Sequence, residues 1–205
     1  AVLSVLLSQT QLLHSSVEIG SISEVRGNAQ VLRDKAYGAE LQFDIQQMDD
    51  VRTESGRVAI TFQDESTVKL TEHSKLVIDE YIYDPDPSKS KMALKFASGT
   101  ARFITGKFNN KSNISIRTPT ADIAIRGTDF TCTVDELGRS LVILLPDENG
   151  ISSGEILVST AMGSVTLNKP YQATTVSVYE NNPTKPVTLD ISLDLIDNML
   201  IVNPP

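Results

Sequence analysis

The most restrictive feature of this sequence is a rhythm of short segments in which apolar and polar residues alternate. From Leu41 onward such segments recur about every 8 to 12 residues, with turn-forming residues between them. Val58, Ile60 and Phe62 form one of these alternating faces. A βαβ fold would need helical stretches of about 10 to 15 residues between strands, and the middle of the chain has none. The sequence therefore predicts an all-β fold, a roll or sandwich of many short, mostly antiparallel strands with N- and C-terminal arms.

The stretch from Thr118 to Phe130 predicts a strand, a corner and a second strand. Pro119 lacks a backbone N–H, so it can begin a strand but not lie in its centre. Ile123 and Ile125 share one face of the extended chain, and we expect them to be in the core with Phe130. Gly127 interrupts the alternation, so we expect a backbone conformation there that other residues rarely adopt.

Two charged residues flank this corner, Arg126 and Asp129. We expect a structural role in which carbonyl oxygens and the neighbouring acid hold Arg126 in place. Ligand binding by the pair is the alternative. The predicted structural corner comprises Pro119, Arg126, Gly127, Thr128, Asp129 and Phe130.

The Arg-Gly-Thr-x-Phe sequence at 126–130 closely resembles the signature of the FecR domain family. Two upstream runs strengthen the resemblance: 50–64 is similar to the family's D-x-V-x-T and A-x-I-x-F-x-D run, and 99–106 to its central glycine-bounded hairpin. The resemblance extends from about Gly20 to Val178. Glu65 departs from it, because the family usually has glycine at this position of the turn.

The resemblance implies an all-β roll and a role as part of a sensor. FecR-type proteins typically combine a cytoplasmic anti-sigma region, one transmembrane helix and a periplasmic β-domain that relays receptor occupancy by protein contact. This sequence resembles the β-domain only, with the anti-sigma region and the transmembrane helix both missing. We expect a domain division of 1–16 as an N-terminal arm, 17–180 as the FecR-like β-domain and 181–205 as a C-terminal arm.

Composition and motifs exclude several functions. The net charge of −8 argues against a nucleic-acid partner. The sequence contains no run of about 18 apolar residues, so we expect no membrane insertion. His14 and His73 have no partner at metal-ligand spacing, and no nucleophile or phosphate-binding motif occurs. We therefore expect no enzyme, no cofactor and no metal. Cys132 shares a face with Phe130 and is expected to be a buried, inert thiol, with a reactive thiol as the alternative.

The two predicted arms are rich in apolar residues, and the pattern leaves helix or strand open for both. Each would expose a large apolar patch on a monomer, so we expect both to lie in subunit interfaces. The proposed assembly residues are Leu3, Leu6, Leu7, Leu189, Ile191, Leu193 and Leu195.

These arms favour a non-enzymatic, self-associating structural protein of a virion or an extracellular appendage. Its expected partners are copies of itself and other structural proteins. The alternative is a periplasmic FecR-type module that senses or relays a signal by protein–protein contact.

Overall fold

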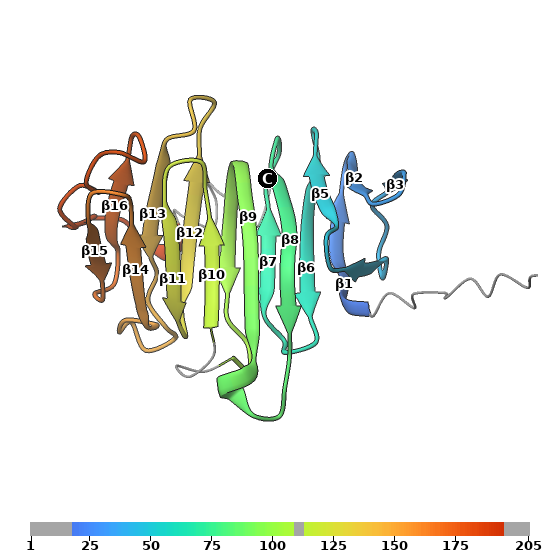
Figure 1. The fold of residues 1–205 in the computed structure, drawn as a ribbon, viewed down its shortest axis with the longest axis horizontal. Coiled ribbons are helices and arrows are strands. Elements are labelled where there is room, and N and C mark those ends of the chain that lie inside the picture. Colours follow the sequence, from blue (N-terminus) through green and yellow to red (C-terminus); the bar gives the residue numbers. More distant parts are fainter. Residues whose placement is uncertain (1–17, 109–112, 195–205) are drawn as a thin grey trace, which may run out of the picture.

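The computed structural model describes residues 18–108 and 113–194 as two β-sheets packed face to face (Figure 1). One strand belongs to both sheets and joins them into a continuous structure of 17 strands. The all-β sandwich predicted by the alternating pattern is therefore confirmed. Within the described residues, no helix is long and apolar enough to cross a membrane.

Sheet A contains nine strands in the described part of the chain. In spatial order they are β4 (Asp44–Gln46), β1 (Glu18–Arg26), β6 (Arg57–Phe62), β7 (Thr67–Leu70), the second part of β9 (Lys91–Ile104), β12 (Asp129–Val134), β13 (Ser140–Leu144), β16 (Gln172–Val176) and β17 (Val187–Thr188).

Sheet B contains nine described strands, again counting β9. In spatial order they are β3 (Ala36–Gly38), β2 (Ala29–Leu32), β5 (Asp50–Thr53), β8 (Lys75–Ile82), the first part of β9, β10 (Asn113–Arg117), β11 (Asp122–Arg126), β14 (Glu155–Ser159) and β15 (Ser164–Leu167). Pairing between the described strands is antiparallel, except that β10 runs parallel to β9. A short 3₁₀ helix, Pro87–Lys89, lies between β8 and β9.

Strand β9 lies in the middle of the molecule, with β1 to β8 on one side and β10 to β17 on the other (Figure 1). Residues 91–98 pair in sheet B, and residues 99–104 pair in sheet A. Gly99 makes the transition with φ of 96°, and a side chain there would collide with Ser74. The glycine-bounded hairpin expected at 99–106 is therefore wrong: Gly99 bends a continuous strand from one sheet into the other.

The core between the sheets contains the residues predicted from the corner stretch. Phe130 is fully buried, and Ile123 and Ile125 are 1% and 3% exposed. Phe130 stacks on Phe103, with ring centroids 5.0 Å apart. Cys132 is buried beside them, and burial raises the pKa of its thiol to about 12, so the thiolate that would react is disfavoured at neutral pH.

The described part of the C-terminal segment lies on its own domain. Strand β17 pairs with β16, and the side chains of Leu189, Ile191 and Leu193 pack against the outer face of sheet A. The pattern left helix or strand open for this segment; the structure has a strand at Val187–Thr188, which the open edge of β16 receives within the same chain. Leu195 and the N-terminal residues Leu3, Leu6 and Leu7 lie outside the described residues.

Candidate functional site

The corner at 126–130 carries the chain from β11 in sheet B to β12 in sheet A. Gly127 has φ of 53°, the left-handed conformation expected for it. The next residue is clamped: Thr128 N–H donates to Thr105 Oγ1 (2.7 Å), while the amide and hydroxyl of Thr105 both donate to the Thr128 carbonyl (3.0 Å each). Asp129 N–H donates to Ser153 Oγ at 2.9 Å. The corner is thus held by segments on both sides of it.

A close backbone approach fixes the corner further. Gly154 passes so near the carbonyls of Arg126 and Gly127 that a Cβ on Gly154 would overlap them. Gly127 itself has open space around its α-carbon, so only its φ angle disfavours a side chain there. Two glycines therefore serve this corner for different physical reasons.

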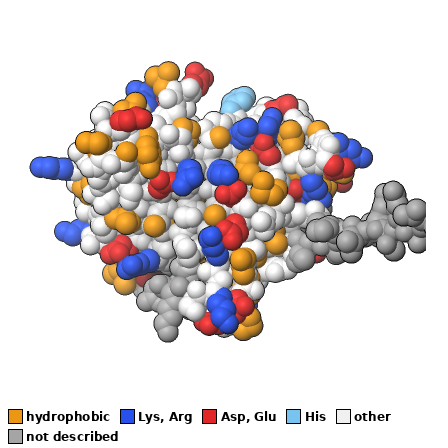
Figure 2. Space-filling model, viewed as in Figure 1, with side chains coloured by type: hydrophobic (Ala, Val, Ile, Leu, Met, Phe, Trp, Pro, Cys, Tyr) orange, Lys and Arg blue, Asp and Glu red, His pale blue; other side chains and the backbone are white. Residues whose placement is uncertain are grey.

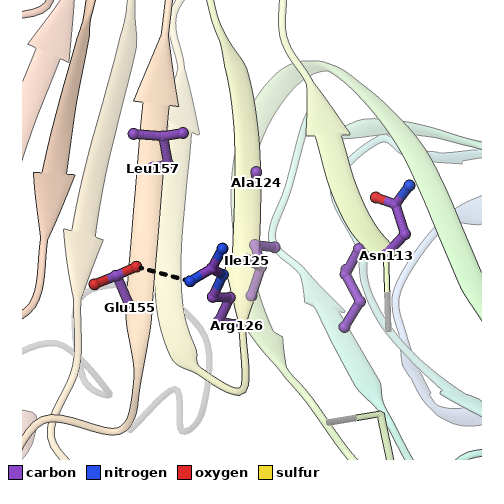
Figure 3. A pocket seen from close by; sticks show the side chains of 7 residues that line it. Asn113, Ala124, Ile125, Arg126, Glu155 and Leu157 are labelled. Atoms are coloured by element: carbon purple, nitrogen blue, oxygen red, sulfur yellow. Dashed lines mark ion pairs between the residues drawn. The ribbon is translucent and has the colours of Figure 1, made fainter. Parts of the chain in front are cut away.

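The expected pairing of Arg126 with Asp129 is wrong. Asp129 binds Arg102 of β9 through two parallel hydrogen bonds, Nε to Oδ1 at 2.8 Å and Nη2 to Oδ2 at 2.7 Å. Arg126 instead extends across the outer face of sheet B toward Glu155, 3.7 Å away (Figure 3). The turn at Gly127 explains the separation, because it places the two side chains on opposite outer faces of the sandwich.

The Arg102–Asp129 pair is half-buried, with side chains 13% and 19% exposed. Partial burial and bidentate geometry strengthen such a pair relative to one in open water. The pair joins β9 to β12 on the outer face of sheet A. Its role in the fold is to fix the register of these strands beside the corner.

Pro119 lies apart from the rest of the predicted corner. It is exposed in the turn between β10 and β11, at the far end of β11 from Gly127. The turn is organised by hydroxyl groups: Ser140 Oγ lies 2.7 Å from the hydroxyls of both Thr118 and Thr120. The Thr-Pro-Thr sequence therefore stabilises the opposite end of the sandwich.

A second signature segment meets the first at the corner end of the molecule. Asp64 is fully buried, accepts hydrogen bonds from the hydroxyls of Tyr81 (2.9 Å) and Ser66, and its carbonyl accepts the amide of Lys107. Ser66 Oγ in turn accepts the amide of Gly106 at 2.9 Å. Burial, followed by the charge of Asp64, raises the pKa of Tyr81, which keeps its hydroxyl protonated as a donor.

Glu65 adopts φ of 67° in the turn between Asp64 and Ser66. This is the left-handed region that glycine occupies without strain. The departure from the family pattern noted in the sequence thus leaves the left-handed turn in place, with Glu65 carrying the strain. The Glu65 carboxylate forms an exposed ion pair with Lys107.

An open hollow of about 550 Å³ lies beside the corner. The Arg102–Asp129 pair and the Thr105–Thr128 clamp contribute to its wall, and Leu193 reaches it from the C-terminal segment. Thr128 Oγ1 is buried here without a hydrogen-bond partner among the described residues. The full lining is Arg102, Ile104, Thr105, Gly106, Phe108, Gly127, Thr128, Asp129, Pro146, Asp147, Glu148, Ser153 and Leu193.

A second hollow, of about 300 Å³, lies on the outer face of sheet B (Figure 3). Arg126 and Glu155 stand at one side of it, Asn113 at the other, and Leu157, 39% exposed, lies along β14. In residues 18–108 and 113–194, no group of three or more His, Cys, Asp or Glu side chains could hold a metal ion.

Sequence reasoning missed several residues that build the corner. Arg102 and Thr105 lay within the expected hairpin at 99–106, but nothing in the sequence indicated that they face a segment more than 20 residues later. Ser153 and Gly154 lie in a stretch rich in turn-forming residues, and nothing in that stretch predicts a contact with the corner. The pairing of β14 with β11 brings them to the corner, and this is a tertiary effect.

Comparison with known proteins gives one family and one fold. The family model described as "FecR protein" matches residues 49–165, more than half of the chain. Two crystal structures of a "putative anti-sigma factor" from Parabacteroides distasonis, at 1.65 and 2.50 Å resolution, are similar with TM-scores of 0.53 and 0.54. Each is 15% identical over 69% of this chain, and the match spans 60% of the solved chain. A search of curated proteins gives no match.

The family match overturns the function preferred from the apolar arms. A structural, self-associating protein of a virion or extracellular appendage conflicts with a family whose members are signalling proteins. The C-terminal arm misled because an apolar, alternating segment can cover a surface of its own domain, as residues 187–194 do here. The structural likeness, at 15% identity, adds the fold alone.

Proposed function

Because the chain belongs to the FecR family, we propose that it is a periplasmic signal-relay module that works through protein–protein contact. The observation that carries this proposal is the family match over residues 49–165, which spans β5 to β14, part of β15 and the whole corner. FecR-like proteins act by protein contact, and their β-domains are typically periplasmic. The family is regulatory and not typically enzymatic.

The geometry of the corner supports a role in protein–protein contact rather than in catalysis. Arg102 is paired with Asp129, Thr105 with the backbone of Thr128, and Ser153 with the amide of Asp129, whereas Thr128 Oγ1 has no partner among the described residues. We propose that the corner is structural, and that it holds the loops at one end of the sandwich in a fixed arrangement. A rigid loop platform is a common basis for recognition of another protein.

The chain covers 60% of the length of the solved chains it resembles. Control of a sigma factor by the whole protein is therefore part of the proposal. In this scheme the β-domain receives a signal from a receptor on one side and passes it to a regulator on the other.

A gene deletion in the source organism tests the proposal. Loss of a signal-relay module should change transcription of a small set of genes severalfold in response to an inducing signal, and the wild-type gene should restore the response. Fractionation of the complemented cells should place the protein in the periplasm. An unchanged transcriptome, together with loss of an extracellular assembly, would contradict the proposed function.

A further inference from the structure

The outer face of sheet A carries an apolar strip at the β13–β16 end. Ile143, Leu145 and Ala173 form a buried cluster there, distinct from the main core, with Leu141 and Tyr171 packed at its margin. The intervening residues of β13, Val142 and Leu144, face the sandwich interior. Strand alternation therefore gives β13 apolar side chains on both faces, and the outer set needs its own cover.

The cover is a short segment of the same chain, residues 187–194, which we call the strap. Leu189, Ile191 and Leu193 point to the strip at alternate positions, and Asp190, Ser192 and Asp194 lie between them on the solvent side. Strand β17 and a hydrogen bond from Leu189 N–H to the Tyr171 carbonyl (2.9 Å) attach its backbone to the edge of sheet A. The strap thus begins as an added edge strand, β17, and residues 189–194 continue from it with one apolar side against sheet A.

The strap is anchored at its base by Thr184, which precedes it, and continues from there as a short strand. At the base, Thr184 N–H donates to the Thr175 carbonyl (3.0 Å), Thr184 Oγ1 accepts the Thr175 amide (2.9 Å), and the Thr184 carbonyl accepts the Thr174 hydroxyl (2.7 Å). Beyond it, β17 is only two residues long, and the apolar contacts are to a cluster of three buried side chains. Short edge segments are typical of the parts of a domain that open locally without global unfolding.

The strap also reaches the corner. Leu193 lines the same hollow as Arg102, Thr105 and Thr128. Lifting the strap would therefore uncover a continuous surface that runs from the apolar strip to the hollow beside the corner.

We propose that this strip is a docking groove for an extended segment of a signalling partner, and that the strap is its resident, displaceable occupant. The sequence of the strap indicates which partner segment would fit the groove. Such a segment has apolar side chains at every second position, acidic or small polar side chains between them, and a backbone that can pair with β16. A partner segment of this kind would add to the sheet edge in place of β17. The identity of the partner as a signalling protein rests on the proposed function, whereas the groove and its exchange of occupants do not.

Peptide binding to the full-length chain tests the groove. A double variant, Leu189→Asp with Ile191→Asp, places two charges against the apolar strip and should release the strap. A fluorescent peptide of residues 185–194 should then bind this variant at least tenfold more tightly than it binds the wild-type chain, as measured by anisotropy. The same peptide with Asp at 189 and 191 should bind neither, and Val187→Asp, a charge at an exposed strap position, should leave the chain like wild type.

Two outcomes would overturn the groove: no peptide binding to a double variant that keeps the wild-type circular dichroism and a cooperative melt, or equal binding to variant and wild type. If the double variant does not fold, hydrogen exchange of the wild-type chain decides. The Leu189 amide should exchange at least a hundredfold faster than amides of β13, and exchange of both only through global unfolding would refute a displaceable strap. These readings are independent of transcription, so either proposal can fail alone.

Discussion

The two outer faces of the sandwich differ in the kind of side chain that they expose to water. Sheet B carries ion pairs along and between neighbouring strands, and Figure 2 shows acidic and basic side chains lying beside one another over a broad face. The pairs on sheet B are Arg52–Asp50, Lys75–Asp50, Lys95–Asp79, Lys91–Glu80, Arg117–Asp122 and Arg126–Glu155.

Sheet A instead carries hydroxyl groups, the half-buried Arg102–Asp129 pair and the strapped apolar strip. Thr61 bonds Ser23 across β6 and β1, and Thr100 bonds Thr133 across β9 and β12. A face of exposed ion pairs stays hydrated without a cover, whereas an apolar strip must be covered. The exchange of occupants proposed above therefore concerns sheet A, the face with a covered apolar strip.

Substitutions in the core between the two sheets should have the largest effect on the free energy of unfolding. Phe130→Ala should lower the free energy of unfolding by about 3 to 5 kcal/mol, because a fully buried ring stacked on Phe103 is lost. Leu157→Ala, on the outer face of sheet B, should cost about 1 kcal/mol or less. Urea unfolding of both variants measures this, and similar costs would mean that the interior of the sandwich has been assigned to the wrong side of the strands.

Matched acid-to-amide substitutions compare the two faces directly. Asp129→Asn weakens the half-buried pair on sheet A and should cost about 1.5 to 3 kcal/mol, the range for hydrogen bonds to charged groups. Asp122→Asn weakens the exposed Arg117 pair on sheet B and should cost less than about 1 kcal/mol. Equal costs in chemical denaturation would remove the distinction between the faces.

The corner that joins the faces should show a smaller effect. Gly127→Ala should cost about 1 to 2 kcal/mol, because the left-handed backbone disfavours a Cβ even where there is space for one. Gly38→Ala is the matched control: its surroundings are equally open and its φ is not positive, so it should be neutral or slightly stabilising. A thermal melt distinguishes them, and a neutral Gly127→Ala would show that the corner tolerates other conformations.

The smallest effect belongs to the ion pairs of sheet B. A double-mutant cycle with Asp79→Asn and Lys95→Gln should give a coupling energy of about 0.2 to 1 kcal/mol, since the side chains are 35% and 48% exposed. The coupling energy should fall toward zero in about 1 M salt, because the Debye length is then only about 3 Å and exposed charges are screened from one another. A larger coupling that survives salt would mean that sheet B also depends on specific contacts.

Local pattern was enough to predict the strands and their buried sides. Ile123, Ile125 and Phe130 were assigned correctly because the side-chain period of a strand is two, whatever the strand pairs with. The left-handed conformation of Gly127 followed from the break in that period. These features depend on neighbours in the sequence.

Contacts between residues far apart in the sequence could not be predicted from the local pattern. Asp129 finds Arg102, 27 positions earlier, because β12 lies beside β9, and no spacing rule connects the two residues. Gly99 had the pattern of a hairpin turn but bends one strand between two sheets, since Ser74 leaves no room for a side chain. The strap had the pattern of an arm, and its destination depended on an open edge at β16.

The position of β9 has a consequence for how the chain comes together during synthesis. Each pairing of β1 to β8 involves only strands up to β9, and each pairing of β10 to β17 involves only β9 and later strands. The first half can therefore assemble as soon as it emerges, and it then offers β9 as a template with one unpaired edge in each sheet. We expect the second half to add outward from that template in sequence order, with the strap last. The interval before β10 and β12 arrive is when the nascent chain is most exposed to mispairing.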